Sequence, residues 1–283
     1  YLNRVIRTEQ MEGVVQFEEI ERDFSPEFKA MYVDPNDPAV IIFTAGLLGR
    51  ALGETLTHRN LDTNSDLLRD VAKVGPETRG LAIIPLFHAF GASVILLGTL
   101  KVGGTVYLVE RVDFPRLIPW LQEARVTYSG LVPMVFYGLL YHPSCKKLDL
   151  SSLKIAISGG AHLPYEIYER FCERYGIDVY HGYGLTESSP VVSWNNIHIP
   201  NKPRTVGTAI ADVTIQIHDE KGNPLPVGQE GEVVTSGPNV MLGYFGKPTE
   251  TKTVIRNGWL YTGDIGHLDQ DGYLTLTGLK KDL

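Results

Sequence analysis

The stretch that decides the fold is Tyr180-His181-Gly182-Tyr183-Gly184-Leu185-Thr186-Glu187. It begins at the end of an apolar strand predicted over residues 178–181. Ligands of open parallel sheets bind at the carboxyl ends of the strands, so this position indicates a binding edge. Tyr183 can stack on a flat ring, Thr186 can donate a hydrogen bond to a phosphate, and Glu187 is an oxygen ligand suited to Mg²⁺. The alternative is an exposed loop with an acidic residue and no binding role. These residues alone do not decide between a binding site and such a loop.

Strands and helices alternate around this stretch as far as about residue 205. The predicted strands are 14–17, 39–43, 81–84, 105–109, 127–131, 153–157 and 178–181, and the predicted helices are 60–73, 91–100, 114–124, 134–141 and 165–175. Such alternation is typical of a parallel α/β sheet. The run at 39–43 is continuously apolar, which predicts a strand buried in a parallel sheet.

The pattern changes after residue 205. Strands are predicted at 213–218, 231–236 and 273–277, and turns rich in Gly, Pro and Asp join them with little helix between. We therefore predict an α/β fold of layered parallel sheets with flanking helices over residues 1–205. A small β-rich, barrel-like subdomain is predicted over 206–277, and a boundary segment over 278–283.

The composition is that of a globular protein. Of its 283 residues 43% are apolar and 21% are charged, which is enough to bury a sizeable core. The net charge of −7 argues against a nucleic-acid partner. Cys145 and Cys172 form no Cys-x-x-Cys pair, so a disulfide framework or zinc site is not expected, and a reducing cytoplasm is predicted.

Residues 81–100 contain no charged residue and have the length of a transmembrane helix. Pro85, His88, Gly91 and Gly98 interrupt this segment, so we expect a short strand, a turn and a buried helix. No transmembrane segment is predicted.

Three further stretches carry candidate binding residues. Glycines at Thr44–Gly53 follow a strand, and their amides can cradle an anion; the alternative is a tight structural turn, since Arg50 is the only cation from Ala45 to Gly53. Ser158-Gly159-Gly160-Ala161 leaves room for a flat ring. Asp264 can accept both hydroxyls of a ribose, or can be structural.

Pro85-Leu86-Phe87-His88-Ala89-Phe90-Gly91 places a histidine among aromatic residues after a strand. Its imidazole is either catalytic or a satisfied core group, and both readings stay open. Gly-x-Ser-x-Gly, Gly-x-Gly-x-x-Gly and His-Glu-x-x-His do not occur, which argues against α/β-hydrolase, dinucleotide and zinc-protease sites.

Taken together and in this order, the motifs resemble those of the superfamily of acyl-CoA synthetases, nonribosomal adenylation domains and luciferases. The matching segments are the phosphate loop (43–53), T-H-x-N-L (57–61), the acyl motif (85–91), the adenine-site glycines (158–161), Y-G-x-T-E (183–187), the Gly-Glu to Gly-Tyr motif (231–244) and the Y-x-T-G-D type motif (260–264). The resemblance covers essentially the whole chain and is closest to fatty acid–CoA ligases.

The resemblance implies an ATP-dependent acid–CoA ligase that makes an acyl-AMP and passes the acyl group to CoA. ATP, Mg²⁺ and CoA are the implied cofactors and co-substrate, and an apolar carboxylic acid is the implied substrate. By carry-over the catalytic residues are Thr186, Glu187 and His88, with Glu187 as the Mg²⁺ ligand. The nucleotide-binding residues are Thr44, Gly46, Gly49, Gly159, Gly160, Ala161, Tyr183, Gly184 and Asp264. His88, Phe90 and Gly91 would line the acyl pocket, and Lys281 would be the hinge. A homodimer is left open.

The chain departs from the family pattern in its phosphate loop. The family's hydroxyl residues, proline and lysine are replaced by Ala45, Leu47, Leu48, Ala51 and Leu52, and its nucleotide-contacting Arg by Leu279. The family's first segment and its mobile C-terminal domain are expected to be missing from this sequence. These departures favour the alternative of a degenerate adenylate-binding or regulatory homologue. A luciferase-like or peptide-synthetase domain is a third hypothesis.

Overall fold

The structure is a computed structural model that describes residues 6–7, 15–16, 22, 25, 27, 29–45, 47–72, 74–109 and 112–280; side chains are not described at 6–7, 15–16 and 70–72. The chain divides into two units, residues 1–34 and 35–283. In the first, β1 (Ile6–Arg7) pairs in parallel with β2 (Val15–Gln16).

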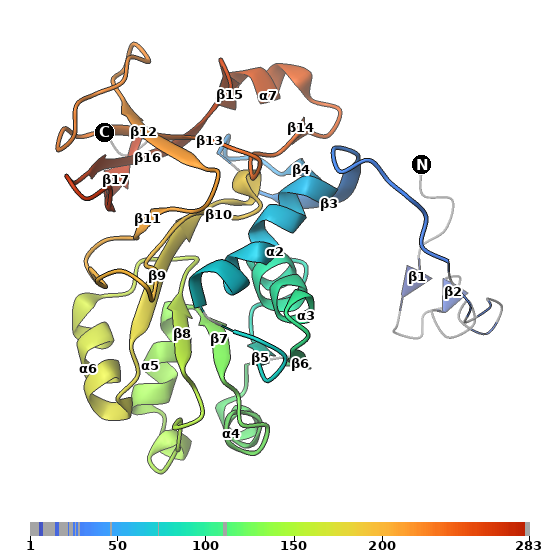
Figure 1. The fold of residues 1–283 in the computed structure, drawn as a ribbon, viewed down its shortest axis with the longest axis vertical. Helices are drawn as coiled ribbons and strands as arrows, with labels where there is room; N and C mark the ends of the chain where they lie inside the picture. The colour runs from blue at the N-terminus through green and yellow to red at the C-terminus, as the bar shows by residue number, and fades with distance from the viewer. Residues whose placement is uncertain are drawn as a thin grey trace. The chain divides into compact units, whose positions relative to one another are not determined.

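A seven-stranded sheet is the centre of the second unit (Figure 1). Its strands are β5 (Arg79–Ala82), β6 (Thr105–Leu108), β7 (Tyr128–Leu131), β8 (Ile155–Ser158), β9 (Val179–Gly184), β10 (Val191–Trp194) and β11 (Thr208–Ala209). They lie in the order β11-β10-β9-β8-β7-β5-β6. The pairs from β6 to β9 are parallel, whereas β10 and β11 are antiparallel. The predicted α/β architecture is confirmed.

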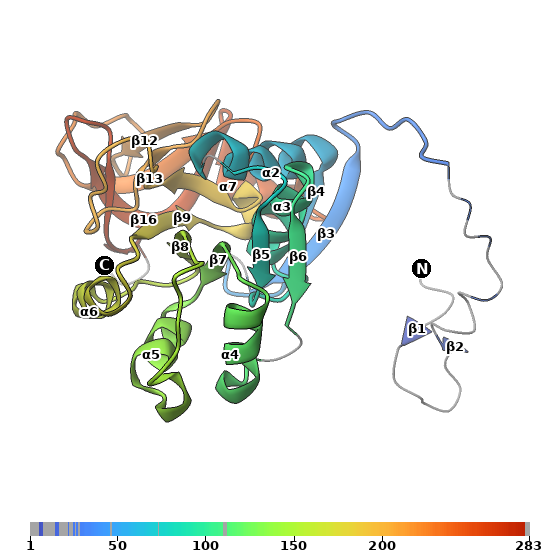
Figure 2. The same cartoon turned by 60° about the horizontal axis from the view of Figure 1, so that its bottom comes forward.

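Helices cover both faces of this sheet (Figure 2). One face packs on α4 (Phe114–Glu123), α5 (Pro133–Tyr141) and α6 (Tyr165–Tyr175), where Phe136 and Phe171 are fully buried and meet edge to face. The other face packs on α2 (His58–Ala72) and the π-helix η1 (Phe90–Leu97), which continues into α3 (Gly98–Lys101). Because side chains alternate along a strand, Leu81 belongs to the first core and Ala82 to the second.

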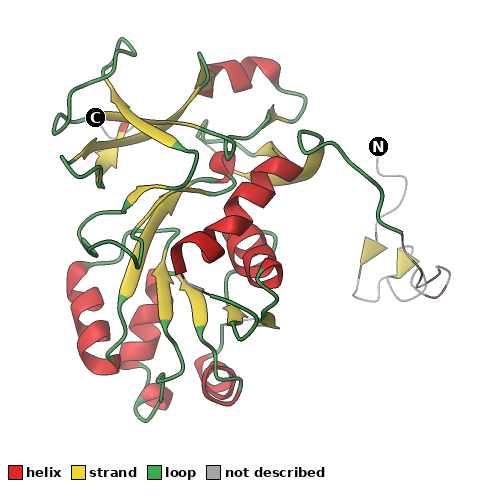
Figure 3. Cartoon of the chain, in the orientation of Figure 1, coloured by secondary structure: helices red, strands yellow, loops and turns green. Residues whose placement is uncertain are grey.

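Two antiparallel sheets complete the unit (Figure 3). The first joins β3 (Pro38–Thr44), β4 (Leu52–Thr57) and β14 (Gly243–Tyr244). The second joins β12 (Thr214–His218), β13 (Gly231–Ser236), β15 (Ile255–Arg256), β16 (Trp259–Leu268) and β17 (Leu274–Leu279). The short helices are η2 (Pro143–Cys145), η3 (Thr186–Ser188) and α7 (Pro248–Val254).

The prediction that residues 39–43 form a buried strand of a parallel sheet is wrong. They lie in β3, which is antiparallel to β4, and Phe43 is 70% exposed. An apolar run predicts that a strand forms, but it does not indicate which strand it will pair with. The expected single loop at 43–53 also needs correction, because Leu52 and Gly53 already belong to β4.

Residues 81–100 form the end of β5, a turn, the π-helix and the start of α3. In the part of the chain that the structure describes, no helix has the length and apolar character needed to cross a bilayer.

Candidate functional site

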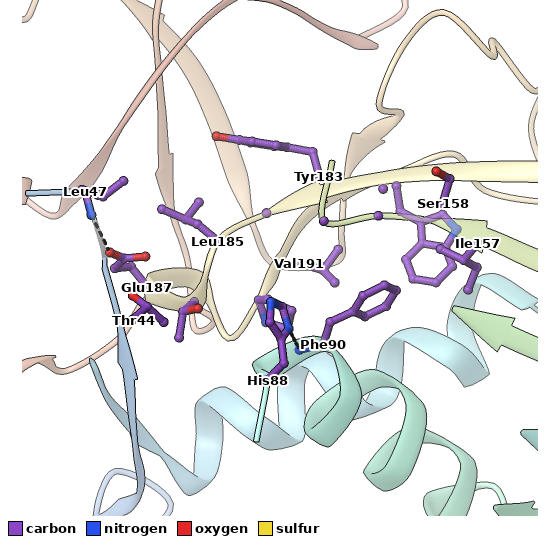
Figure 4. Close-up of a pocket in the computed structure, with 17 residues that line it drawn as sticks. Thr44, Leu47, His88, Phe90, Ile157, Ser158, Tyr183, Leu185, Glu187 and Val191 are labelled. Carbon is purple, nitrogen blue, oxygen red and sulfur yellow. Dashed lines mark hydrogen bonds between the residues drawn. The ribbon is translucent and has the colours of Figure 1, made fainter. Parts of the chain in front are cut away.

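A cavity of about 280 Å³ lies at the carboxyl ends of β8 and β9 (Figure 4). The chain runs from β5 to β6 on one side of β5 and then crosses to β7 on the other side. Ligands of open α/β sheets bind at the carboxyl ends of the strands near such a reversal of strand order. The predicted site residues that line the cavity are Thr44, His88, Phe90, Gly159, Gly160, Tyr183, Gly184, Thr186 and Glu187. Segments from β3, the turn after β5, β8 and β9 therefore converge on this cavity.

Other predicted residues lie outside the lining. Gly49, Gly91, Ala161 and Asp264 do not line the cavity, and Gly46 and Lys281 lie outside the described residues. Gly91 has a packing role, since a Cβ there would overlap the carbonyl oxygens of Pro85 and Ile84. Gly184 permits close approach in the same way, because its Cβ would overlap the carbonyl of Pro190 between β9 and β10.

Asp264 does not line the cavity, but it is hydrogen-bonded to Tyr183, which does. The Tyr183 hydroxyl donates to Asp264 Oδ2 at 2.6 Å, so β16 is linked to the cavity-lining strand β9. Burial raises the pKa of Asp264, and the hydrogen bond from Tyr183 opposes that shift. The pair places a carboxylate beside an aromatic ring, which suits a ribose next to a stacked base.

Glu187 is the buried carboxylate of the cavity, at 2% exposed. Its Oε1 accepts from the Leu47 amide at 3.3 Å, as Figure 4 shows, and from the Tyr244 hydroxyl at 2.9 Å. No group of three His, Cys, Asp or Glu residues able to hold a metal occurs among the described residues. Mg²⁺ commonly uses one or two protein carboxylates and takes its other ligands from water and substrate phosphates, so Glu187 fits it.

The phosphate loop engages its polar groups with the protein. The Thr44 hydroxyl donates to Glu54 Oε1 at 2.6 Å, and the Arg50 guanidinium forms an exposed ion pair with Glu250 at 2.7 Å. Leu52, at the position of the family's lysine, is 4% exposed and belongs to the core beneath β4. The loop's single cation is thus directed to α7.

His88 and Phe90, from the turn after β5 and the start of η1, also line the cavity. His88 Nδ1 accepts from the Phe90 amide at 3.1 Å, which orients the exposed imidazole, and partial desolvation lowers its pKa. The Phe90 ring lies close over β7 and β8, because a Cβ at Gly130 or Gly159 would come within 2.9 or 3.0 Å of it. A side chain at position 159 would therefore require the Phe90 ring to move by a few tenths of an ångström.

Sequence reasoning missed part of the cavity lining. The lining residues outside every predicted motif are Ile157, Pro190, Val191 and Trp194. Leu47, Gly182 and Leu185 lie inside predicted motifs without an assigned role, and Ser158 belongs to the predicted ring-binding stretch. Val191-Val192-Ser193-Trp194 has the β-branched and aromatic residues typical of a strand, and this signal could have predicted β10. Ser158 Oγ is buried and has no hydrogen-bond partner among the described residues, so it is available to a ligand.

We expect a pH-dependent stability from His181 on β9. Burial, and secondly the charge of His162, lowers its pKa from 6.5 to about 4. The unfolded chain therefore binds more protons between these values, and stability is lost as pH falls from 6.5 towards 4. Relative to His181→Asn, the wild type should lose about 3 kcal/mol more unfolding free energy over this range. Urea unfolding at a series of pH values measures this, and parallel curves for the two proteins would contradict it.

Comparison with known proteins agrees with this geometry. The family model "AMP-binding enzyme" matches residues 3–245. The long-chain-fatty-acid–CoA ligase of Bacillus subtilis is 36% identical over 257 residues, 89% of this chain and 46% of the relative. Feruloyl-CoA synthase of Amycolatopsis is 35% identical over 249 residues, 88% of this chain and 50% of the relative. The chain thus spans about half the length of the curated relatives it matches.

Solved structures agree as well. ATP-bound MatB from Rhodopseudomonas palustris superposes with a TM-score of 0.88 at 30% identity, covering 94% of this chain and 53% of that one. The O-succinylbenzoate CoA synthetase of Bacillus subtilis, in complex with AMP, gives a TM-score of 0.81 at 26% identity, over 96% and 56%. With a family model matched along most of its length and a cavity built from the same motifs, the chain belongs to the family of AMP-binding enzymes.

Proposed function

We propose that this chain is the nucleotide- and acyl-binding part of an ATP-dependent acid–CoA ligase. The observation that carries the proposal is the convergence of Thr44, Ser158–Gly160 and Tyr183–Glu187 on one cavity whose other wall is His88 and Phe90. Relatives named as acid–CoA ligases and synthases support it.

In the first step, a carboxylate oxygen of the acid attacks the α-phosphorus of ATP, and the bond to pyrophosphate breaks. Tyr183 stacks on the base, Asp264 accepts from the ribose hydroxyls, and Thr186 donates to a phosphate oxygen. Glu187 would hold Mg²⁺, which would neutralise phosphate charge when bound. In the second step a thiol, that of CoA, attacks the acyl carbonyl and AMP leaves. The protein's contribution is positioning and charge stabilisation.

The proposed substrate class is an apolar carboxylic acid, fatty or aromatic. The cavity lining includes the apolar residues Phe90, Ile157, Val191 and Trp194, and burial of apolar surface favours binding by about 25 cal/mol per Å². His88 beside these residues would orient the carboxylate. Cytoplasmic location, a homodimer and the boundary between residues 205 and 206 stay predictions.

A second candidate is a degenerate homologue that binds adenylate without pyrophosphate chemistry. Leu52 lies in the core, and Arg50 is paired with Glu250, so the loop offers few charge-assisted contacts to a leaving pyrophosphate. Each such contact contributes about 1.5–3 kcal/mol.

Calorimetric binding of AMP and of Mg-ATP to this chain, side by side, separates the two candidates. A ligase core is expected to bind both, and Mg-ATP more tightly than AMP. Binding of AMP with no gain from ATP would favour the degenerate homologue, and no binding of either nucleotide would refute both.

A further inference from the structure

The cavity has a polar side and an apolar side. Figure 4 shows Thr44 and Glu187 together at one side. Phe90 and Ile157 lie at the other side, and both belong to the core between the central sheet and the layer of α2 and η1. The apolar part of an acid therefore fits at this second side, and the residue that closes it limits how long that part can be.

Trp194 belongs to the same core and lines the same cavity. It is the last residue of β10, it pairs with Gly182 of β9 and Thr208 of β11, and it is 3% exposed. A Cβ at Gly182, which also lines the cavity, would lie 3.8 Å from the Cε3 atom of the indole. The six-membered ring of the indole therefore lies beside the cavity-lining backbone of β9.

A second cavity, of about 360 Å³, lies between α2 and the β10–β11 edge of the sheet. Its lining includes Leu67 and Ile210, which belong to the same core as Trp194. Asp62 and Asp212 in the lining are exposed, so this cavity opens to the solvent. Among the described residues, Trp194 is the only one that lines both cavities. It therefore separates two spaces within one layer of the molecule.

We propose that the Trp194 indole closes the apolar side of the cavity and restricts the substrate to compact acids, aromatic or short-chain, whose apolar part ends in front of the ring. This inference rests on the proposed function and adds a length limit to it. The cavity of about 280 Å³ is small beside the range of about 300–1,000 Å³ typical of ligand sites. A longer chain has to displace a buried indole, which strains a close-packed core.

The test is calorimetric titration of this chain with 5′-O-(N-acylsulfamoyl)adenosines, stable analogues of an acyl-AMP, in a series from acetyl to dodecanoyl. For the wild type, affinity is expected to rise about 4-fold for each methylene that is buried, and to fall once the tail meets the indole. In Trp194→Ala the tail can continue into the second cavity. The ratio of dodecanoyl to acetyl affinity is therefore expected to rise at least about 10-fold over that of the wild type.

Two control variants show where the tail goes. Ala209 lines only the second cavity, so the double variant Trp194→Ala with Ala209→Phe places a phenyl ring in that space. Its affinity ratio is expected to return to within about 3-fold of the wild-type ratio, a difference of under 1 kcal/mol. Phe136→Leu removes part of a buried ring from the core on the other face of the sheet and should leave the ratio unchanged.

Two results would overturn the inference: a wild-type affinity that keeps rising through dodecanoyl, or an unchanged ratio in a folded Trp194→Ala variant. Thermal unfolding checks that each variant is folded. If Trp194→Ala does not fold, Trp194→Leu carries the test with the same expected direction. AMP titration of the same samples separates the hypotheses. Intact AMP binding with an unchanged ratio refutes the length limit alone, whereas absence of binding by AMP and by every analogue refutes the proposed function and the length limit with it.

Discussion

Asp264→Ala is expected to weaken AMP binding to this chain by about 100-fold, because about 3 kcal/mol of charge-assisted hydrogen bonding to the ribose hydroxyls is lost. The Asp264 carboxylate is held beside the cavity by the Tyr183 hydroxyl at 2.6 Å. Isothermal titration calorimetry with AMP measures the loss, and the proposed ribose role is abandoned if affinity is unchanged.

The alanine variant also leaves the Tyr183 hydroxyl without this partner, which costs about 1–3 kcal/mol of stability if no other group replaces it. Asp264→Asn controls for that effect, because its amide oxygen still accepts from Tyr183 while the negative charge is gone. We expect Asp264→Asn to retain wild-type stability and to bind AMP with intermediate affinity. Equal affinities of Asp264→Asn and wild type would show that the charge plays no part.

Glu187→Gln is expected to remove the advantage of Mg-ATP over AMP, lowering Mg-ATP affinity by about 10- to 100-fold. Glutamine retains an oxygen that can accept from the Leu47 amide and the Tyr244 hydroxyl, so the cavity wall is kept. AMP binding needs no metal and should change less than about 3-fold, a difference of under 1 kcal/mol. Calorimetry with both nucleotides, at saturating and zero Mg²⁺, measures the two affinities.

The control for this variant is Glu250→Gln, which also removes one carboxylate but lies in the exposed ion pair with Arg50. It should not weaken Mg-ATP binding, and stronger binding would indicate that the released Arg50 reaches the phosphates. If Glu187→Gln binds Mg-ATP as the wild type does, Glu187 is not the Mg²⁺ ligand.

Much of the site could be predicted from short stretches of sequence. Tyr183–Glu187 and Ser158–Gly160 begin in the last residues of the adjacent parallel strands β9 and β8, and the carboxyl ends of such strands lie at one sheet edge. His88 follows β5 of the same sheet, so its arrival at the cavity obeys the same rule. Local sequence patterns were therefore enough to predict the position of residues at the carboxyl end of a strand in the parallel sheet.

Other contacts depend on pairings that no local pattern specifies. Tyr183 and Asp264 are 81 residues apart, and Leu47 and Glu187 are 140 apart. The burial of Glu54 follows from β3 and β14 pairing on both sides of β4. In the sequence, Glu54 is an ordinary polar residue after a glycine. Its burial without a hydrogen bond to Oε2 can be recognised only from the structure, in which strands pair on both sides of β4.

The sequence by itself determined the alternation of strands and helices, the family and the sheet edge that carries the site, because each depends on periodicity and on motifs that are local in the chain. The tertiary structure alone decided that residues 38–44 pair antiparallel outside the parallel sheet and that Leu52 enters the core. It also decided that Arg50 pairs with Glu250 and that Glu54 is buried. The physical reason is that burial and charge pairing are properties of neighbours in space, and these neighbours come from strands that are distant in sequence.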